Sequence, residues 1–144
     1  MNLGERRYEP DDNGRILLVE EERPVQEMIV RWLRAAGRQC ECALDRNAAA
    51  AALDRRSFDL VITDVCMPGY CDFDLLLQLQ AKLPELPVLV LTSCNDPRFA
   101  TKALTYGAWG YLLKPVPLRD LLSQVNRALE RSFHLRASRP STVV

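Results

Sequence analysis

The chain has 144 residues, of which 48% are hydrophobic and 26% charged, a balance typical of one globular domain that buries its own core. Its 19 basic residues cancel its 19 acidic residues, so the net charge gives no reason to expect direct nucleic-acid binding. No apolar run approaches the ~20 residues of a membrane span, and residues 1–14 lack the apolar core of a secretory signal. We therefore expect no membrane contact and a cytoplasmic location.

Short apolar runs alternate along the chain with segments whose apolar residues have helical spacing. The run at 15–19 (RILLV) shows no polar alternation, which favours a strand covered on both faces. Gly37 marks the end of the first helix, Asp45 is placed to cap the second, and Met67-Pro68-Gly69 breaks the third strand. The pattern predicts strands over 15–19, 38–44, 59–64, 87–92 and 109–113, and helices over 24–36, 46–55, 72–83, 96–106 and 117–131.

Five strand–helix units in series predict an α/β fold, a doubly wound parallel sheet with helices on both faces. We expect a flexible lead-in over 1–14, one domain over 15–131, and a polar tail or linker over 132–144 with no output domain after it.

Polar side chains follow four of the predicted strands where each one ends. Glu20-Glu21-Glu22 follows the first strand, Asp64 ends the third, Thr92 ends the fourth, and Lys114 follows the fifth. Ligand chemistry in open parallel sheets occurs beyond the carboxyl ends of the strands, so these groups should share one edge. Carboxylates, a hydroxyl and an ammonium group indicate a site for a phosphoryl group and Mg²⁺, in which an aspartate can act as the nucleophile.

The ordered segments ILLVEEE, DLVITDVCMPG, VLVLTS and GYLLKP resemble the response-regulator receiver domain of two-component signalling, as in single-domain chemotaxis regulators. The resemblance covers roughly residues 15–131. It implies a flavodoxin-like sheet of five strands in the order 2-1-3-4-5. It also implies a phosphoprotein of a phosphorelay that takes its phosphoryl group from a histidine kinase or phosphotransfer protein and signals to a downstream protein. Such a domain is not an enzyme in the ordinary sense, because it catalyses only its own phosphorylation and dephosphorylation.

The resemblance also implies the site residues. Asp64 matches the phosphorylated aspartate, and Mg²⁺ would be held by Glu20, Glu21, Asp64 and the backbone carbonyl of Cys66, with Glu21 and Asp64 as the direct carboxylate ligands. Thr92 matches the switch hydroxyl and Tyr111 the aromatic switch. Lys114 matches the phosphate-binding lysine, and its bond to Pro115 is expected to be cis.

Two positions depart from the family pattern. The acidic pair usually contains at least one aspartate, whereas here both residues are glutamates, and the extra methylene displaces the carboxylate from near-ideal Mg²⁺ geometry. We therefore expect weaker Mg²⁺ binding or slower phosphorylation. Trp109-Gly110 stands where many transcription-factor receivers carry acidic residues, so a homodimer through the fourth helix, fifth strand and fifth helix is in doubt.

Other interpretations stay open. Asp64 could cap the following loop, and Thr92 could be present only because strands favour threonine. The three glutamates could be solvent-exposed residues without a metal role, and Tyr111 and Trp109 could have only a packing role. The domain could be a degenerate receiver that binds partners without phosphorylation. A nucleotide- or flavin-binding protein lacks support, because no glycine-rich loop follows the first strand. Cys66, Cys71 and Cys94 could sense redox state or bind a soft metal, although free thiols are the simpler interpretation; Cys40 and Cys42 fit packing, and His134 fits a solvated surface position.

Overall fold

The computed structural model describes residues 14–67 and 69–138, so residues 1–13 of the lead-in expected over 1–14, together with Pro68 and residues 139–144, lie outside the described part of the chain. The strands are β1 (Arg15–Val19), β2 (Gln39–Ala43), β3 (Leu60–Asp64), β4 (Cys66–Met67), β5 (Tyr70–Cys71), β6 (Val88–Thr92) and β7 (Gly110–Leu113). The helices are α1 (Arg23–Ala35), α2 (Arg46–Arg55), α3 (Asp74–Lys82), α4 (Pro97–Thr105) and α5 (Leu118–Ser138).

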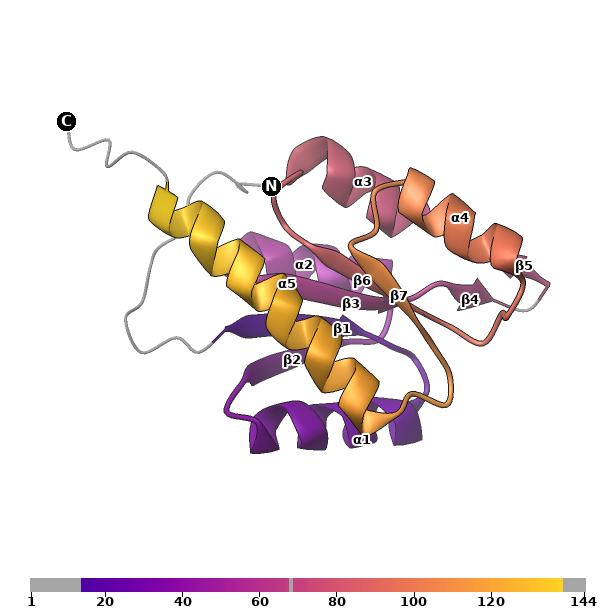
Figure 1. Ribbon diagram of the computed structural model, residues 1–144, viewed down its shortest axis with the longest axis horizontal. Helices are drawn as coiled ribbons and strands as arrows, with labels where there is room; N and C mark the ends of the chain where they lie inside the picture. The colour runs from indigo at the N-terminus through magenta and orange to yellow at the C-terminus, as the bar shows by residue number, and fades with distance from the viewer. Residues whose placement is uncertain (1–13, 68, 139–144) are drawn as a thin grey trace.

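Five of these strands form one parallel sheet in the order β2-β1-β3-β6-β7. Counted among the sheet's own strands, this is the order 2-1-3-4-5 that the resemblance implied. Helices α1 and α5 cover one face of the sheet, and α2, α3 and α4 cover the other (Figure 1). The α/β doubly wound, flavodoxin-like fold is therefore confirmed.

Each central strand divides its side chains between two apolar cores. In β1, Ile16 and Leu18 pack in the core beneath α1 and α5, whereas Leu17 and Val19 pack in the core beneath α2, α3 and α4. Both sides of the strand are dry, so there is no position at which a polar residue would face water. This two-sided burial explains why the strand segments are uninterrupted apolar runs in the sequence.

Local hydrogen bonds mark where two of the helices begin. The Asp45 carboxylate accepts a hydrogen bond from the backbone N–H of Ala48 at 2.8 Å, which confirms the predicted cap of α2. Asp96 accepts one from the backbone N–H of Arg98 at 2.9 Å at the start of α4. These caps satisfy helical N–H groups that have no partner within the helix.

The chain after β3 differs from the sequence prediction. Strands β4 and β5 pair in an antiparallel hairpin, with Cys66 opposite Cys71, where we expected only a break and an early helix start at 72. The backbone N–H of Asp72 donates to the carbonyl of Val65 at 2.8 Å, which holds this residue in the hairpin. Helix α3 therefore begins two residues later than predicted.

Helix α5 extends past the predicted end at residue 131, so the assignment of 132–138 to a polar tail was wrong. Leu121, Val125 and Leu129 are buried at helical spacing, and the spacing continues to the buried Ser132. Phe133 packs against the same core. The composition after residue 131 is mainly polar and therefore does not predict the helix face that packs against the core. None of the helices in the described part of the chain is long and apolar enough to span a bilayer.

Candidate functional site

The carboxyl ends of the parallel strands bring the predicted polar residues to one edge of the sheet. Glu20 follows the last residue of β1, and Asp64 is the last residue of β3. Thr92 ends β6, and Lys114 follows β7, where its backbone N–H donates to the Thr92 carbonyl at 2.8 Å. The peptide bond between Lys114 and Pro115 is cis, as the resemblance implied.

The Lys114 ammonium group joins two carboxylates at the centre of this edge. Its Nζ donates to Asp64 Oδ2 at 2.9 Å and to Glu20 Oε1 at 3.1 Å, and Glu20 Oε2 lies 3.0 Å away in the same ion pair. The Glu20 and Asp64 side chains are 0% and 9% exposed, and that of Lys114 is 14% exposed. The site therefore buries two negative charges against one positive charge.

This imbalance shifts the titration of the groups involved. Burial raises the pKa of the Glu20 carboxyl, the Lys114 hydrogen bond opposes that rise, and the nearby charge of Asp64 adds to it, so the pKa stays above its usual value. Burial lowers the pKa of Lys114, but its hydrogen bonds to Asp64 and Glu20 outweigh burial and raise the pKa overall. Lys114 is therefore held as a cation, whereas ionised Glu20 is disfavoured.

Backbone groups and a thiol form hydrogen bonds with Asp64 and Thr92 at the strand ends. The backbone N–H of Cys66 donates to Asp64 Oδ1 at 2.9 Å, so each Asp64 oxygen has one partner. Thr92 is fully buried, and its Oγ1 accepts a hydrogen bond from the N–H of Cys94 at 2.9 Å. The same oxygen lies 2.9 Å from Cys66 Sγ, which also accepts the N–H of Ser93 at 3.3 Å.

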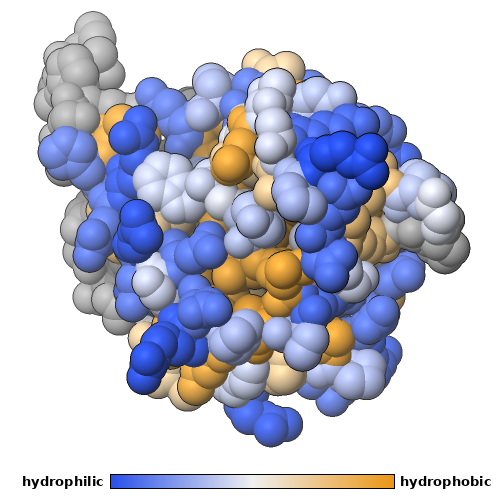
Figure 2. Space-filling view, turned by 45° about the vertical axis from the view of Figure 1, so that its right-hand side comes forward, coloured by the Kyte–Doolittle hydropathy of each residue, from blue (hydrophilic) through white to orange (hydrophobic). Residues whose placement is uncertain are grey.

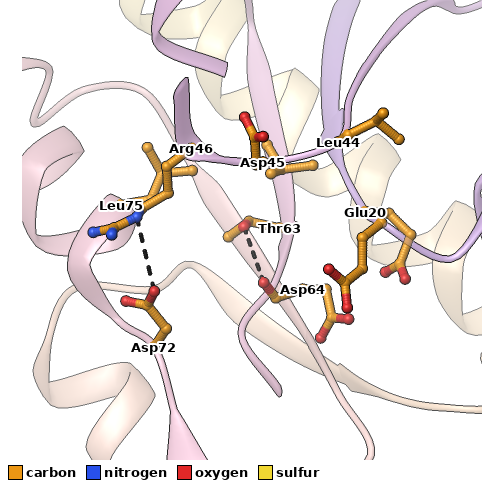
Figure 3. Close-up of a pocket in the computed structure, with 10 residues that line it drawn as sticks. Glu20, Leu44, Asp45, Arg46, Thr63, Asp64, Asp72 and Leu75 are labelled. Atoms are coloured by element: carbon orange, nitrogen blue, oxygen red, sulfur yellow. Dashed lines mark hydrogen bonds and ion pairs between the residues drawn. The ribbon is translucent and has the colours of Figure 1, made fainter. Parts of the chain in front are cut away.

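A cavity of about 200 Å³ opens beside Asp64 (Figure 3). Glu20 and Glu21 line it together with Asp64, and Arg46 and Asp72 lie across from them. Arg46 Nη1 lies 2.8 Å from Asp74 Oδ2 and its Nε lies 3.8 Å from Asp72 Oδ2, so this arginine is already paired with acidic groups. The cavity is thus acidic on the Asp64 side and joins the Asp64 carboxylate to solvent.

The donor atoms of this cavity fit Mg²⁺. Its carboxylate oxygens are the hard ligands that Mg²⁺ prefers, and one or two suffice because the ion keeps several waters. Glu20 Oε2 is buried without a hydrogen bond, although it lies in the ion pair with Lys114. Within residues 14–67 and 69–138, no three His, Cys, Asp or Glu side chains are grouped as a ready metal centre. These residues therefore suit a Mg²⁺ ion that keeps most of its water ligands.

Most of the chain matches a known protein family. The model of the response regulator receiver domain matches residues 16–126. The chain belongs to this family. The receiver domain is therefore established, and it places the protein among the response regulators of two-component systems.

The curated relatives are larger response regulators. The chain is 37% identical over 114 residues to the response regulator protein FleR of Pseudomonas aeruginosa, covering 79% of this chain and 24% of the relative. It is 31% identical over 116 residues to the DNA-binding transcriptional regulator NtrC of Salmonella typhimurium, covering 81% and 25%. The chain thus spans about a quarter of the length of these relatives.

Solved receiver domains share the fold over nearly their whole length. A response regulator receiver domain protein from Clostridium thermocellum is 30% identical, with a TM-score of 0.76, covering 85% of this chain and 98% of that one. The chemotaxis protein CheY4 of Vibrio cholerae is 29% identical, with a TM-score of 0.73, covering 81% and 98%. The likeness therefore extends over the receiver fold as a unit.

Some of the predicted site residues are in contact with one another, and others are not. Asp64, Glu20 and Lys114 are in direct contact, whereas Glu21 is exposed on the cavity wall. Tyr111 is half-buried on β7 and packs against the core beneath α2, α3 and α4. Trp109 is exposed beside Arg131. Both rings therefore have packing contacts, and the switch role of Tyr111 stays a prediction.

The receiver domain contains one contact that the sequence analysis missed, between Cys66 Sγ and Thr92 Oγ1. The sequence had indicated the backbone carbonyl of Cys66 as a Mg²⁺ ligand and redox sensing or soft-metal binding for its thiol, but no contact of the thiol with Thr92. The Pro-Gly dipeptide at 68–69 is a turn signal in the sequence, and a hairpin predicted from it would have indicated the direction of this side chain.

Replacing Glu20 with glutamine should stabilise the receiver domain by about 1 kcal/mol at pH 7, because it removes one of two buried carboxylates that share a single cation. Chemical unfolding measures the change. Folding raises the pKa of the Glu20 carboxyl, so the folded wild type binds a proton on Glu20 more tightly than the unfolded wild type does. The stability gained by Glu20→Gln should therefore shrink as the pH falls towards the pKa of Glu20 in the unfolded chain. Glu21→Gln is the matched control, since that side chain is exposed, and equal effects at both positions would contradict the argument.

Proposed function

We propose that this receiver domain accepts a phosphoryl group on Asp64 from a histidine kinase or phosphotransfer protein in the cytoplasm. The observation that carries the proposal is the 2.9 Å contact between Lys114 Nζ and Asp64 Oδ2 beside an acidic cavity. A carboxylate held next to a cation, with room for a ligand, has the groups that phosphoryl transfer requires.

The reaction forms one bond and breaks one. A carboxylate oxygen of Asp64 attacks the phosphorus, the new acyl phosphate bond forms, and the bond to the donor breaks, with its electron pair leaving on the donor. The Cys66 N–H holds Oδ1, so Asp64 is oriented before the donor arrives. The Lys114 ammonium group can follow the charge from the carboxylate to the phosphoryl oxygens.

Bound Mg²⁺ would neutralise charge on the transferred phosphoryl group. Glu21 and Asp64 are its carboxylate ligands in this proposal, with Glu20 and the Cys66 carbonyl as the further groups that the resemblance implies. Thr92 Oγ1 would then leave Cys66 Sγ and donate to the new phosphoryl group, and Tyr111 would turn inward. The domain thus modifies only itself, with the phosphodonor as the second reactant.

The proposed output is a change of partner at the face formed by α4, β7 and α5. Leu104, Leu113 and Leu118 are exposed on these three elements, and Leu113 directly precedes Lys114. Figure 2 turns the side with the strand ends forward and shows apolar residues gathered in a hollow that hydrophilic residues border. Movement of Lys114 and Thr92 can therefore reach a surface suited to a downstream protein or a second copy.

The direct test is incubation of the domain with acetyl phosphate and Mg²⁺. We expect a mass increase of one phosphoryl group, lost on treatment with hydroxylamine as an acyl phosphate is, and borohydride reduction should convert position 64 alone. A phosphorylation-independent interaction module would show no adduct under any Mg²⁺ concentration, and that outcome would reject the proposal.

Shortening Glu21 to aspartate should tighten Mg²⁺ binding about fivefold, since the shorter side chain restores the carboxylate position that octahedral Mg²⁺ geometry favours. Isothermal titration calorimetry measures the affinity. Glu22→Asp is the matched control, because Glu22 is exposed and does not line the cavity. Unchanged or weaker binding by Glu21→Asp would show that the glutamate already fits.

A further inference from the structure

Three cysteines lie close to the phosphorylation site, outside the groups that the proposed reaction uses. Cys66 is in β4, Cys71 is in β5, and Cys94 follows β6, and all three are half-buried free thiols. No three His, Cys, Asp or Glu side chains in the described residues form a metal group, so a soft-metal site has no support there. Of the two functions that the sequence suggested for these cysteines, soft-metal binding and redox sensing, redox sensing by thiol oxidation remains.

The hairpin register aligns two of these thiols. Cys66 is directly opposite Cys71 in the hairpin. The neighbouring pair on the side away from the turn, Val65 and Asp72, is joined by a backbone hydrogen bond of 2.8 Å. Hydrogen-bonded and non-hydrogen-bonded pairs alternate along an antiparallel ladder, so Cys66 and Cys71 form a non-hydrogen-bonded pair. Such a pair has a Cα separation of about 4.5 Å, with both side chains on one face, which falls within the range of ~4.4–6.8 Å that disulfides span.

One of these thiols is also the side-chain partner of the buried hydroxyl. Cys66 Sγ lies 2.9 Å from Thr92 Oγ1 and accepts the N–H of Ser93. Thr92 Oγ1 also accepts the N–H of Cys94, and in its contact with Cys66 Sγ either the hydroxyl or the thiol can be the donor. The thiol therefore occupies the position towards which the Thr92 hydroxyl can donate.

We propose that Cys66 and Cys71 form a reversible disulfide when hydrogen peroxide oxidises the domain, and that this disulfide releases the Thr92 hydroxyl from Cys66 Sγ. In the first step one thiol sulfur bonds to a peroxide oxygen, the O–O bond breaks, and water leaves. In the second step the other thiol displaces the sulfenic oxygen, the S–S bond forms, and a second water leaves. Two thiols are oxidised and one peroxide is reduced, and thiol reductants reverse the product.

The consequence for signalling rests on the proposed function. A disulfide sulfur has no S–H and accepts hydrogen bonds weakly, so Thr92 would lose its resting partner and be free to donate to a phosphoryl group on Asp64. One hydrogen bond is worth about fivefold in an equilibrium. The oxidised domain should therefore hold its phosphoryl group about fivefold longer than the reduced domain.

Tryptic digestion can locate the disulfide without reference to phosphorylation. The domain is treated with hydrogen peroxide, its free thiols are blocked with iodoacetamide, and the peptides are weighed. Cys66 and Cys71 share peptide 57–82, which should lose two hydrogens and escape alkylation, and dithiothreitol should restore both thiols. A pairing with Cys94 would instead join peptide 57–82 to 83–98, and a pairing of Cys40 with Cys42 would stay within 39–46.

Matched variants decide the pairing. Cys71→Ser should abolish the disulfide in peptide 57–82, whereas Cys94→Ser should retain it. Full alkylation of peptide 57–82 in the peroxide-treated wild type, or a cross-link to 83–98, would overturn the proposed pair.

The lifetime of the adduct tests the link to Thr92. Peroxide should lengthen it about fivefold in the wild type and leave it unchanged in Cys71→Ser. A mapped disulfide with an unchanged adduct lifetime would reject the release of Thr92 but leave the disulfide standing. A mapped disulfide in a domain that takes no phosphoryl group in either redox state would reject the proposed function instead.

Discussion

Replacing Asp64 with asparagine should abolish the phosphoryl adduct formed with acetyl phosphate and Mg²⁺. The neutral amide is not a nucleophile for phosphorus under these conditions, so no acyl phosphate can form at this position. The single amide oxygen can keep only one of the two Asp64 donors, the backbone N–H of Cys66 or the Lys114 ammonium, but Lys114 also keeps its bond to Glu20, so the fold should be retained. Intact-mass measurement gives the phosphorylated fraction, and circular dichroism verifies that the variant is folded.

Asp72→Asn is the matched control for this experiment. Asp72 lines the same cavity as Asp64 but lies on its far side, where its cation Arg46 is 3.8 Å away and half exposed, whereas Lys114 is 2.9 Å from Asp64 and nearly buried (Figure 3). The Asp72 variant should therefore keep most of the adduct. If the Asp64 variant keeps its adduct while the Asp72 variant loses it, the acceptor has been assigned to the wrong carboxylate.

The sheet was predictable because burial leaves a clear signal. The apolar runs of β1, β3 and β6 exist because both faces of these strands are covered, and parallel strands with helical connections leave few possible arrangements. Helix α5 was predicted too short because Ser132, a polar residue, is the last buried position among those of its residues whose burial is described, up to residue 135, so composition misrepresented the face that packs. Polarity predicts exposure on average, but helical spacing decides which side faces the core.

The site was predictable at the level of residue type and less so at the level of contact. Strand ends locate Asp64, Thr92 and Lys114, since the sheet topology alone brings them to one edge. The sequence could not decide which glutamate turns inward: Glu20 is the buried partner of Lys114, and Glu21 remains exposed. That choice depends on side-chain direction after the strand ends, where the alternation of a strand no longer applies.

Replacing Lys114 with methionine should have the largest effect on stability, about 2–3 kcal/mol. The change leaves Glu20 and Asp64 as two buried carboxylates without a cation, and breaking a buried ion pair costs about 3–5 kcal/mol, reduced here because the Lys114 side chain is 14% exposed. Urea unfolding measures the loss. Lys82→Met is the control, since Lys82 is exposed on α3 and should change stability by less than about 0.5 kcal/mol.

A second substitution separates the structural role of Lys114 from its role towards phosphate. Adding Glu20→Gln to Lys114→Met removes one of the two unpaired carboxylates, so the double variant should regain much of the lost stability. It should still be phosphorylated about 100-fold more slowly than the wild type, because no cation meets the transferred phosphoryl group. Recovery of both stability and phosphorylation rate in the double variant would mean that Lys114 acts only by holding the carboxylates together.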